Sequence, residues 1–240
     1  MTSNPTWDKK TSAIAVASTY ADRIKGKATS SGSGTATAFA SQDPSVLILL
    51  SRTRHHLESF TGGGVEMQFG VNHFRGFLLT KLLYPLLERH GKSRVVNLSS
   101  YVHGLLPVRF LDCNMLKGVD RVPVEERPVG NLAEVFARVQ GHGYAGTVAY
   151  AMRVVSNLGR EHEEDVAKAI EKTTDYWKNS DEGASTTLVA ALDPALDECR
   201  GLYLADCQFV PCANHARDPD AARRLWALSE ELIGEKFIVI

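Results

Sequence analysis

The segment Ser93-Arg94-Val95-Val96-Asn97-Leu98-Ser99-Ser100 has the form of a central strand in a parallel β-sheet. Its middle is apolar and β-branched, which suits a strand that is buried on both faces. Its last residues, Ser99 and Ser100, carry hydroxyl groups. Because ligands bind at the carboxyl ends of parallel strands, we predict a buried strand over 93–100 with a functional site at its end.

Helical and strand patterns alternate on both sides of this segment. An apolar-periodic segment over 65–90 predicts a long buried helix with a kink at Pro85, and Gly91 ends it. The other expected helices cover 13–24, 35–41, 161–177, 182–192 and 220–233, and the other expected strands cover 46–50 and 202–205. This alternation predicts an α/β fold, a Rossmann-like doubly wound parallel sheet, in a single domain over residues 1–240.

The composition argues against several classes of partner. The chain has 240 residues and a formal net charge of −1, without a basic run, which argues against nucleic acid. The apolar segment 13–17 is too short for a signal peptide or a membrane span, and no histidine or cysteine spacing indicates a metal site. Four cysteines without a CxxC pair favour a reducing compartment, and therefore a cytoplasmic protein; a disulfide between Cys207 and Cys212 is the alternative.

A glycine- and serine-rich segment over 29–35 precedes the expected helix 35–41 and the strand 46–50. Loop, helix, strand and the basic turn at Arg52 form half of a nucleotide-binding βαβ unit. No hydrophobic strand is visible before the loop, so we expect that strand to be missing. Taken alone, such a loop is more often a linker, and Arg52 is as well explained as a solvated surface charge.

Three segments resemble the short-chain dehydrogenase/reductase family, in particular its fungal, retinol-dehydrogenase-like members. They are Glu-Met-Gln-Phe-Gly-Val-Asn-His-Phe at 66–74 with Phe-Leu-Leu-Thr at 77–80, Arg-Val-Val-Asn-Leu-Ser-Ser at 94–100, and Gly-Ala-Ser-Thr-Thr at 183–187 with 191–204. In that family an Asn on the central helix, a Ser after the next strand and a Tyr form the catalytic group. The resemblance assigns these roles to Asn72, Ser100 and Tyr150.

The resemblance also implies a nicotinamide cofactor. Gly32 and Gly34 match the last two glycines of the family's phosphate-binding loop, with Ser31 beside them, while Ala28 stands in the place of the first glycine. Such glycines let the backbone approach the pyrophosphate at a helix N-terminus. Arg52 stands where NADP-preferring relatives place a cation for the 2′-phosphate, so NADP is the expected cofactor.

The chain departs from the family's pattern at the catalytic Lys. That residue should follow Tyr150 by four positions, but Val154 stands there, and the nearest basic side chain is Arg153. Hydride transfer needs a matched proton transfer, for which the pKa of a phenol must fall from about 10 toward neutrality. Because Arg153 differs in geometry and in helical phase, we do not expect it to replace the Lys.

Two internal parts of the family's fold are also missing from the sequence. Between Phe60 and Gly64 the family has a strand, a helix and a further strand, and after Met152 it has a long helix and another strand. The chain resumes the family pattern after each gap. We therefore expect a truncated chain with an incomplete sheet, whose edges and apolar helix faces lack their usual cover.

Three functions stay open at this level. The first is an NADP-dependent oxidoreductase acting on a hydroxyl or ketone of a lipophilic small molecule, as in fungal secondary metabolite biosynthesis. The second is a catalytically inactive relative or a binding protein. The third is a chain that works beside a full-length homologue or as a homo-oligomer. His73 and His103 lack a visible partner, so we expect ordinary helix and loop residues rather than acid/base groups.

Overall fold

A computed structural model describes residues 2–25, 28–31, 38, 41–42, 46–49, 63–66, 69–90, 94–97, 108–111, 176–199 and 201–237. The helices among them are α1 (Ala13–Thr19), α2 (Ala21–Ile24), α5 (Arg75–His90), α8 (Ser180–Leu192) and α9 (Pro219–Ile233), with a π-helical turn η1 (Gly70–Phe74) and the short helices η7 (Pro194–Leu196) and η8 (Asn214–Arg217). The strands are β1 (Ala28–Ser31), β2 (Val46–Leu49), β3 (Leu204–Ala205) and β4 (Gln208–Phe209).

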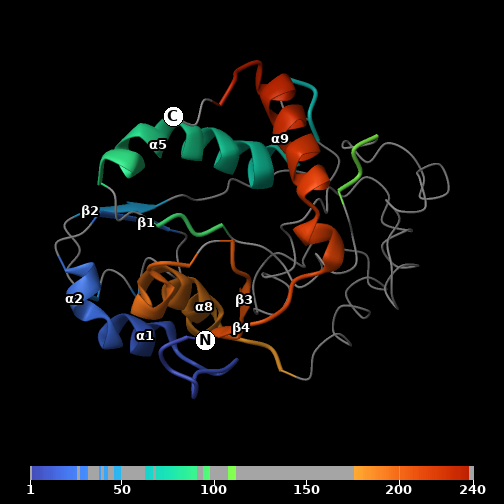
Figure 1. The fold of residues 1–240 in the computed structure, drawn as a ribbon. Helices are drawn as coiled ribbons and strands as arrows, with labels where there is room; N and C mark the ends of the chain where they lie inside the picture. Colours follow the sequence, from blue (N-terminus) through green and yellow to red (C-terminus); the bar gives the residue numbers. More distant parts are fainter. Residues whose placement is uncertain are drawn as a thin grey trace.

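One sheet of the described structure is a parallel strand pair. Strand β1 pairs with β2 in parallel, from Ala28 opposite Val46 to Ser31 opposite Leu49. In Figure 1 the pair lies between α5 on one side and α1 with α8 on the other. Helices on both sides of a parallel strand pair make this an α/β arrangement, as the sequence predicted.

Strand β1 corrects the expectation that residues 29–31 belong to a loop and that no strand precedes Gly32 and Gly34. Ala28–Ser31 is short and weakly apolar, so its composition gives no strand signal. A parallel ladder is formed by backbone groups, however, and β2 supplies a complete partner for it. Tertiary pairing therefore outweighs local propensity here. The predicted strand at 46–50 is confirmed as Val46–Leu49.

Helices α1 and α8 pack against each other and form the larger of the two hydrophobic clusters found among the described residues. On α1 the buried residues are Ala13, Val16 and Ala17, and on α8 they include Leu188 and Val189. Small buried residues at the start of α8, Gly183, Ala184 and Ser185, allow a close approach. The predicted helices over 13–24 and 182–192 are confirmed, with a break at Tyr20 between α1 and α2.

A capping box begins α8. Asn179 Oδ1 accepts hydrogen bonds from the backbone N–H groups of Asp181 and Glu182, each at 2.9 Å. In return, Glu182 Oε2 accepts from the N–H of Asn179 at 3.0 Å. These bonds satisfy N–H groups that the first turn of a helix leaves without a partner, and so fix where α8 begins.

The second cluster joins the start of the long helix to α9. Val65, Phe69 and Phe74 are buried together, with Leu225 and Ile233 of α9 packed against them. The helix begins later than the predicted Val65, because Glu66 Oε2 accepts from the N–H of Phe69 at 2.8 Å and acts as a cap.

The predicted long helix is confirmed as α5 up to His90, whereas the kink at Pro85 stays a prediction and Gly91 lies outside the described residues. Pro85 lies inside α5. Helix α9 matches the predicted 220–233; the side chain of Asp218 caps its start, and Gly234 ends it with a φ of 75°. Glycine suits that left-handed position because it has no Cβ.

In the described part of the segment 93–100, which is residues 94–97, the chain does not form the buried strand that the composition predicts. The described residues Arg94–Asn97 belong to no strand, and Val95 is 48% exposed. Residues 98–100 lie outside the described residues. A strand needs a neighbouring backbone to pair with, whereas the side chain of Arg94 ties this segment to the end of α8.

A small hairpin follows α8. Strands β3 and β4 are antiparallel, and the turn between them contains Asp206 and Cys207, both with positive φ. Lys178, which is almost fully buried, pairs with Asp206 at 2.6 Å. The hairpin confirms the strand predicted near 202–205. Cys207 and Cys212 are both free thiols, so the alternative of a disulfide between them is wrong.

Candidate functional site

The parallel strand pair defines the edge at which a nucleotide site is expected. Ser31 and Leu49 are register partners at the carboxyl ends of β1 and β2. Gly32 follows Ser31 directly in the chain, and Arg52 comes shortly after Leu49. Because both strands end at the same edge, the glycine-rich segment and the basic segment both begin there. Open α/β sheets bind their ligands at this edge.

The first glycine position of the family's loop lies elsewhere. Ala28 is the first residue of β1, so it stands at the opposite end of the strand from Ser31. Only the part of the motif formed by Gly32 and Gly34 follows the strand in the chain. Any phosphate cradle at this edge must therefore be built without the first glycine.

Asn72 lies in the middle of the π-helical turn η1. The N–H of Arg75 donates to the carbonyl of Gly70, which closes the wider turn around Asn72. Single π-helical turns inserted in α-helices are rare and occur frequently at functional sites. The sequence predicted a continuous helix here and gave no sign of this irregularity.

His73, the next residue, connects η1 to α9. Its Nε2 lies 2.7 Å from Ser229 Oγ, and the Ser229 hydroxyl donates to the carbonyl of Leu225 at 2.6 Å. The His73 ring is stacked on Phe69 with 5.3 Å between centroids. Burial lowers the pKa of His73 below its ordinary value, so the neutral imidazole is favoured at pH 7. The prediction that His73 lacks a partner is wrong, because its imidazole bonds to Ser229. The sequence did not reveal this partner, since the two residues lie far apart in the chain.

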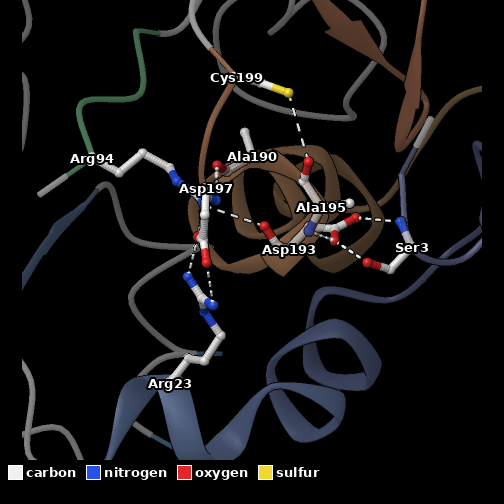
Figure 2. Close-up of polar contacts among 8 residues, drawn as sticks. All are labelled: Ser3, Arg23, Arg94, Ala190, Asp193, Ala195, Asp197 and Cys199. Atoms are coloured by element: carbon white, nitrogen blue, oxygen red, sulfur yellow. Dashed lines mark hydrogen bonds and ion pairs between the residues drawn. The ribbon is translucent and has the colours of Figure 1, made fainter. Parts of the chain in front are cut away.

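Arg94 anchors the start of the segment that leads to Ser100. Its guanidinium donates to the carbonyl of Ala190 at 2.7 Å and to that of Asp193 at 3.2 Å, and it also pairs with the Asp197 carboxylate. Figure 2 shows Arg94 and Arg23 reaching Asp197 from two different parts of the chain. Both guanidinium groups, Arg23 first, hold the pKa of Asp197 below its ordinary value.

Asp193 extends this polar cluster to the N-terminal segment. Its side chain is fully buried and accepts hydrogen bonds from the N–H of Ser3 at 2.7 Å and from the N–H of Ala195 at 2.9 Å, and it also bonds to the Ser3 hydroxyl. Figure 2 shows these bonds converging at the end of α8. The cluster therefore joins the N-terminal segment and the segment that precedes Ser100 to a single helix end.

The structure places few of the predicted site residues. Ser100, Tyr150, Gly32, Gly34 and Arg52 lie outside the described residues. For Asn72 and Ser31 the structure describes the backbone, in η1 and at the end of β1 respectively. The predicted catalytic group is therefore not assembled within the described part of the chain, and its roles stay predictions.

Within the described ranges, no group of three or more histidine, cysteine or carboxylate side chains is arranged to hold a metal ion. None of the helices that the structure describes combines the length and the apolar character needed to cross a membrane.

Comparison with known proteins gives clear relatives. No protein-family profile matches the chain. Retinol dehydrogenase 14 from Mus musculus is 33% identical over 181 residues, which cover 72% of this chain and 54% of the relative. Retinol dehydrogenase 12 from the same species is 34% identical over 73% of this chain and 57% of the relative. The chloroplastic short-chain dehydrogenase TIC 32 A from Brassica napus is 30% identical over 71% of this chain and 58% of the relative.

The chain is a relative of the short-chain dehydrogenases/reductases. This confirms the family resemblance that the motifs around Asn72 and before Ser100 indicated. The chain spans just over half the length of the curated relatives that it matches. A solved structure of an uncharacterized protein from Mycobacterium paratuberculosis overlays with a TM-score of 0.48 at 18% identity, covering 94% of this chain and 90% of that one; a likeness of this degree carries no weight for function.

Proposed function

We propose that this short-chain dehydrogenase/reductase relative is an oxidoreductase that uses NADP and acts on a hydroxyl or ketone of a lipophilic small molecule. The observation that carries the proposal is the parallel register of β1 and β2. Because the two strands are parallel, the glycine-rich segment and the basic segment both follow strands that end at the same edge of the sheet. A dinucleotide binds at such an edge and needs both segments there.

The residues after the two strands fit the two ends of the cofactor's adenosine diphosphate part. Ser31, Gly32 and Gly34 would approach the pyrophosphate through their backbone N–H groups. Arg52 would pair with the 2′-phosphate that distinguishes NADP from NAD, because a guanidinium can bind phosphate with two parallel hydrogen bonds. The bound cofactor supplies or accepts a hydride, and the chain's residues handle the proton.

The proton chemistry is assigned to the three residues that the family resemblance indicates. Tyr150 would act as general acid or base toward the substrate oxygen, and Ser100 would orient that oxygen by a hydrogen bond. Asn72 would support the proton relay from the π-helical turn. The Arg94 anchor supports this assignment, because it fixes the start of the segment that leads to Ser100.

The substrate class follows from the relatives' names and from the resemblance to fungal members. Relatives named retinol dehydrogenases favour a lipophilic alcohol or its carbonyl form. A step of fungal secondary metabolism is compatible with this class. We extend the proposal to a cytoplasmic enzyme that can form a homo-oligomer.

The test is a fluorescence titration with NADPH and NADH, using the wild type and two matched variants. Arg52→Ala should weaken NADPH binding by about tenfold or more, since hydrogen bonds between charged groups contribute about 1.5–3 kcal/mol. Arg54→Ala, which removes the same charge two positions further on, should bind NADPH as the wild type does. Absence of saturable NADPH binding would contradict the proposal. Equal losses in both variants would contradict the assignment to Arg52.

A second candidate function is a catalytically inactive relative, and the observation that favours it is Val154 at the position of the family's Lys. If only that residue is lacking, Val154→Lys should raise turnover by about a hundredfold, the lower range for a general acid/base contribution. Val155→Lys adds the same charge at the adjacent position and should have no such effect. A chain that binds NADPH but gains no turnover from Val154→Lys is a binding protein.

A further inference from the structure

Helix α9 packs against the π-helical turn and holds it in place. Ser229 is fully buried, and Leu225 and Ile233 on either side of it pack against Val65, Phe69 and Phe74. The side chain of His73 contacts α9 by a hydrogen bond between its Nε2 and Ser229 Oγ, at 2.7 Å. The contacts with α9, which lies more than a hundred residues further along the chain, thus fix the position of η1.

The direction of the hydrogen bonds follows from the number of protons available. A serine hydroxyl has one proton, and that of Ser229 is donated to the carbonyl of Leu225 at 2.6 Å. Its oxygen must therefore accept from His73, which makes the imidazole the tautomer that carries a proton on Nε2. The ring is also held between Phe69, on which it stacks, and Phe74, whose centroid lies 5.1 Å away.

A π-helical turn needs such support, because it departs from the hydrogen-bond pattern that the chain otherwise favours. The turn around Asn72 is closed by a bond from Arg75 to Gly70, and the contacts of Phe69, His73 and Phe74 hold its two ends. We propose that His73 is a positioning residue for Asn72: its hydrogen bond to Ser229 holds the π-helical turn that carries Asn72. The role of Asn72 rests on the proposed function, but the link from His73 to the turn does not.

The experiment measures the exchange rate of the Arg75 amide proton in deuterated water by NMR. Ser229→Ala removes the acceptor, and His73→Phe keeps an aromatic ring on Phe69 but removes the donor. Each should accelerate exchange at Arg75 about fivefold, as expected for the loss of one net hydrogen bond. The double variant should be no faster than either single variant, because both remove the same interaction.

Thr80→Val is the matched control. The Thr80 hydroxyl donates to the carbonyl of Gly76 at 2.8 Å, which is the same bond within a helix that Ser229 makes to Leu225. This variant therefore loses an equivalent bond without touching His73, and the exchange rate at Arg75 should stay at the wild-type value. His73→Gln, which retains an N–H donor on a side chain of similar reach, should restore slow exchange.

The outcomes separate the inference from the proposed function. Unchanged exchange at Arg75 in both Ser229→Ala and His73→Phe, or equal acceleration in Thr80→Val, would overturn the inference whatever the chain catalyses. Acceleration in those two variants alone would support it even where NADPH does not bind. In an active wild type, Ser229→Ala should also lower kcat about fivefold, the effect of one lost net hydrogen bond. NADPH affinity should stay unchanged, since Asn72 serves the proton relay and not the cofactor.

Discussion

At the scale of single residues, the buried His73 should make the free energy of unfolding depend on pH. Burial lowers its pKa in the folded chain, while in the unfolded chain the pKa is about 6.5. Below about pH 6.5 the unfolded chain therefore binds a proton that folded His73 does not accept, and the free energy of unfolding falls as the pH falls. The stability contributed by neutral His73 is fully present above the pKa of the unfolded chain. It is lost as the pH falls through the lower pKa of the folded chain.

Urea unfolding of the wild type and His73→Phe between about pH 7.5 and 5 tests this prediction, since the range spans the ordinary histidine pKa. The difference in stability between the two should narrow as the pH falls. Asp197, Glu182 and Glu230 also have lowered pKa values, but carboxylates of this kind act at lower pH. A difference that stays constant with pH would show that His73 titrates alike in the folded and unfolded chains.

Single residues also show how far the sequence leads. Asn72 can be assigned from its motif, because the neighbouring residues form a recognisable pattern. The link between His73 and Ser229 cannot, since nothing in either local pattern marks residues that meet only after α9 packs on η1. The sequence does not reveal the π-helical turn either, because this turn results from packing at its two ends.

At the scale of elements, the end of α8 depends on Arg94. Its guanidinium satisfies the carbonyls of Ala190 and Asp193, and the side chain is 22% exposed. Arg94→Leu should lower the free energy of unfolding by about 1–2 kcal/mol, the range for hydrogen bonds made by charged groups after some screening by solvent.

Arg23 provides the matched control because it pairs with the same Asp197 carboxylate from a side chain that is 37% exposed. Arg23→Leu removes an ion pair near the surface without freeing any carbonyl of α8, and should cost about 0.5 kcal/mol. Thermal and urea unfolding of both variants measure the difference. Similar losses in the two would mean that the ion pair with Asp197, rather than the two carbonyls, holds this end of the helix.

Elements with their own signals were predictable, and those that depend on a partner were not. Helices α8 and α9 both begin at capping side chains, Asn179 and Asp218, and α9 ends at Gly234, so the local sequence marks these helix ends. Segment 94–97 has the composition of a strand but forms none in the structure, and its Arg94 side chain bonds to the end of α8 instead. Strand β1 has no such composition and forms through its pairing with β2. Composition thus reports what a segment can do, and pairing decides what it does.

At the scale of the whole molecule, the described residues form two separate hydrophobic clusters, and the parallel strand pair lies between helices on either side. The cluster of α1 and α8 and the cluster of η1 with α9 are separate groups of buried residues, and Figure 1 shows β1 and β2 between α1 and α5. A ligand at the carboxyl edge of the strands would bind to a strand pair that has helices on both sides. Its binding should therefore stabilise the chain as a whole and not one element.

Adding NADPH should therefore raise the midpoint of thermal unfolding. At about a hundredfold excess over Kd, a ligand that binds only the folded chain adds about 2.7 kcal/mol. For a chain of this size that corresponds to a rise of about 5–10 °C. NADH, which lacks the 2′-phosphate, should give a smaller rise, and Arg52→Ala should bring NADPH down to the same level as NADH. A full NADPH shift without turnover would mean that the fold keeps its cofactor edge but has lost the proton chemistry with the residue that Val154 replaces. No shift with either nucleotide would mean that the strand pair no longer supports a nucleotide site.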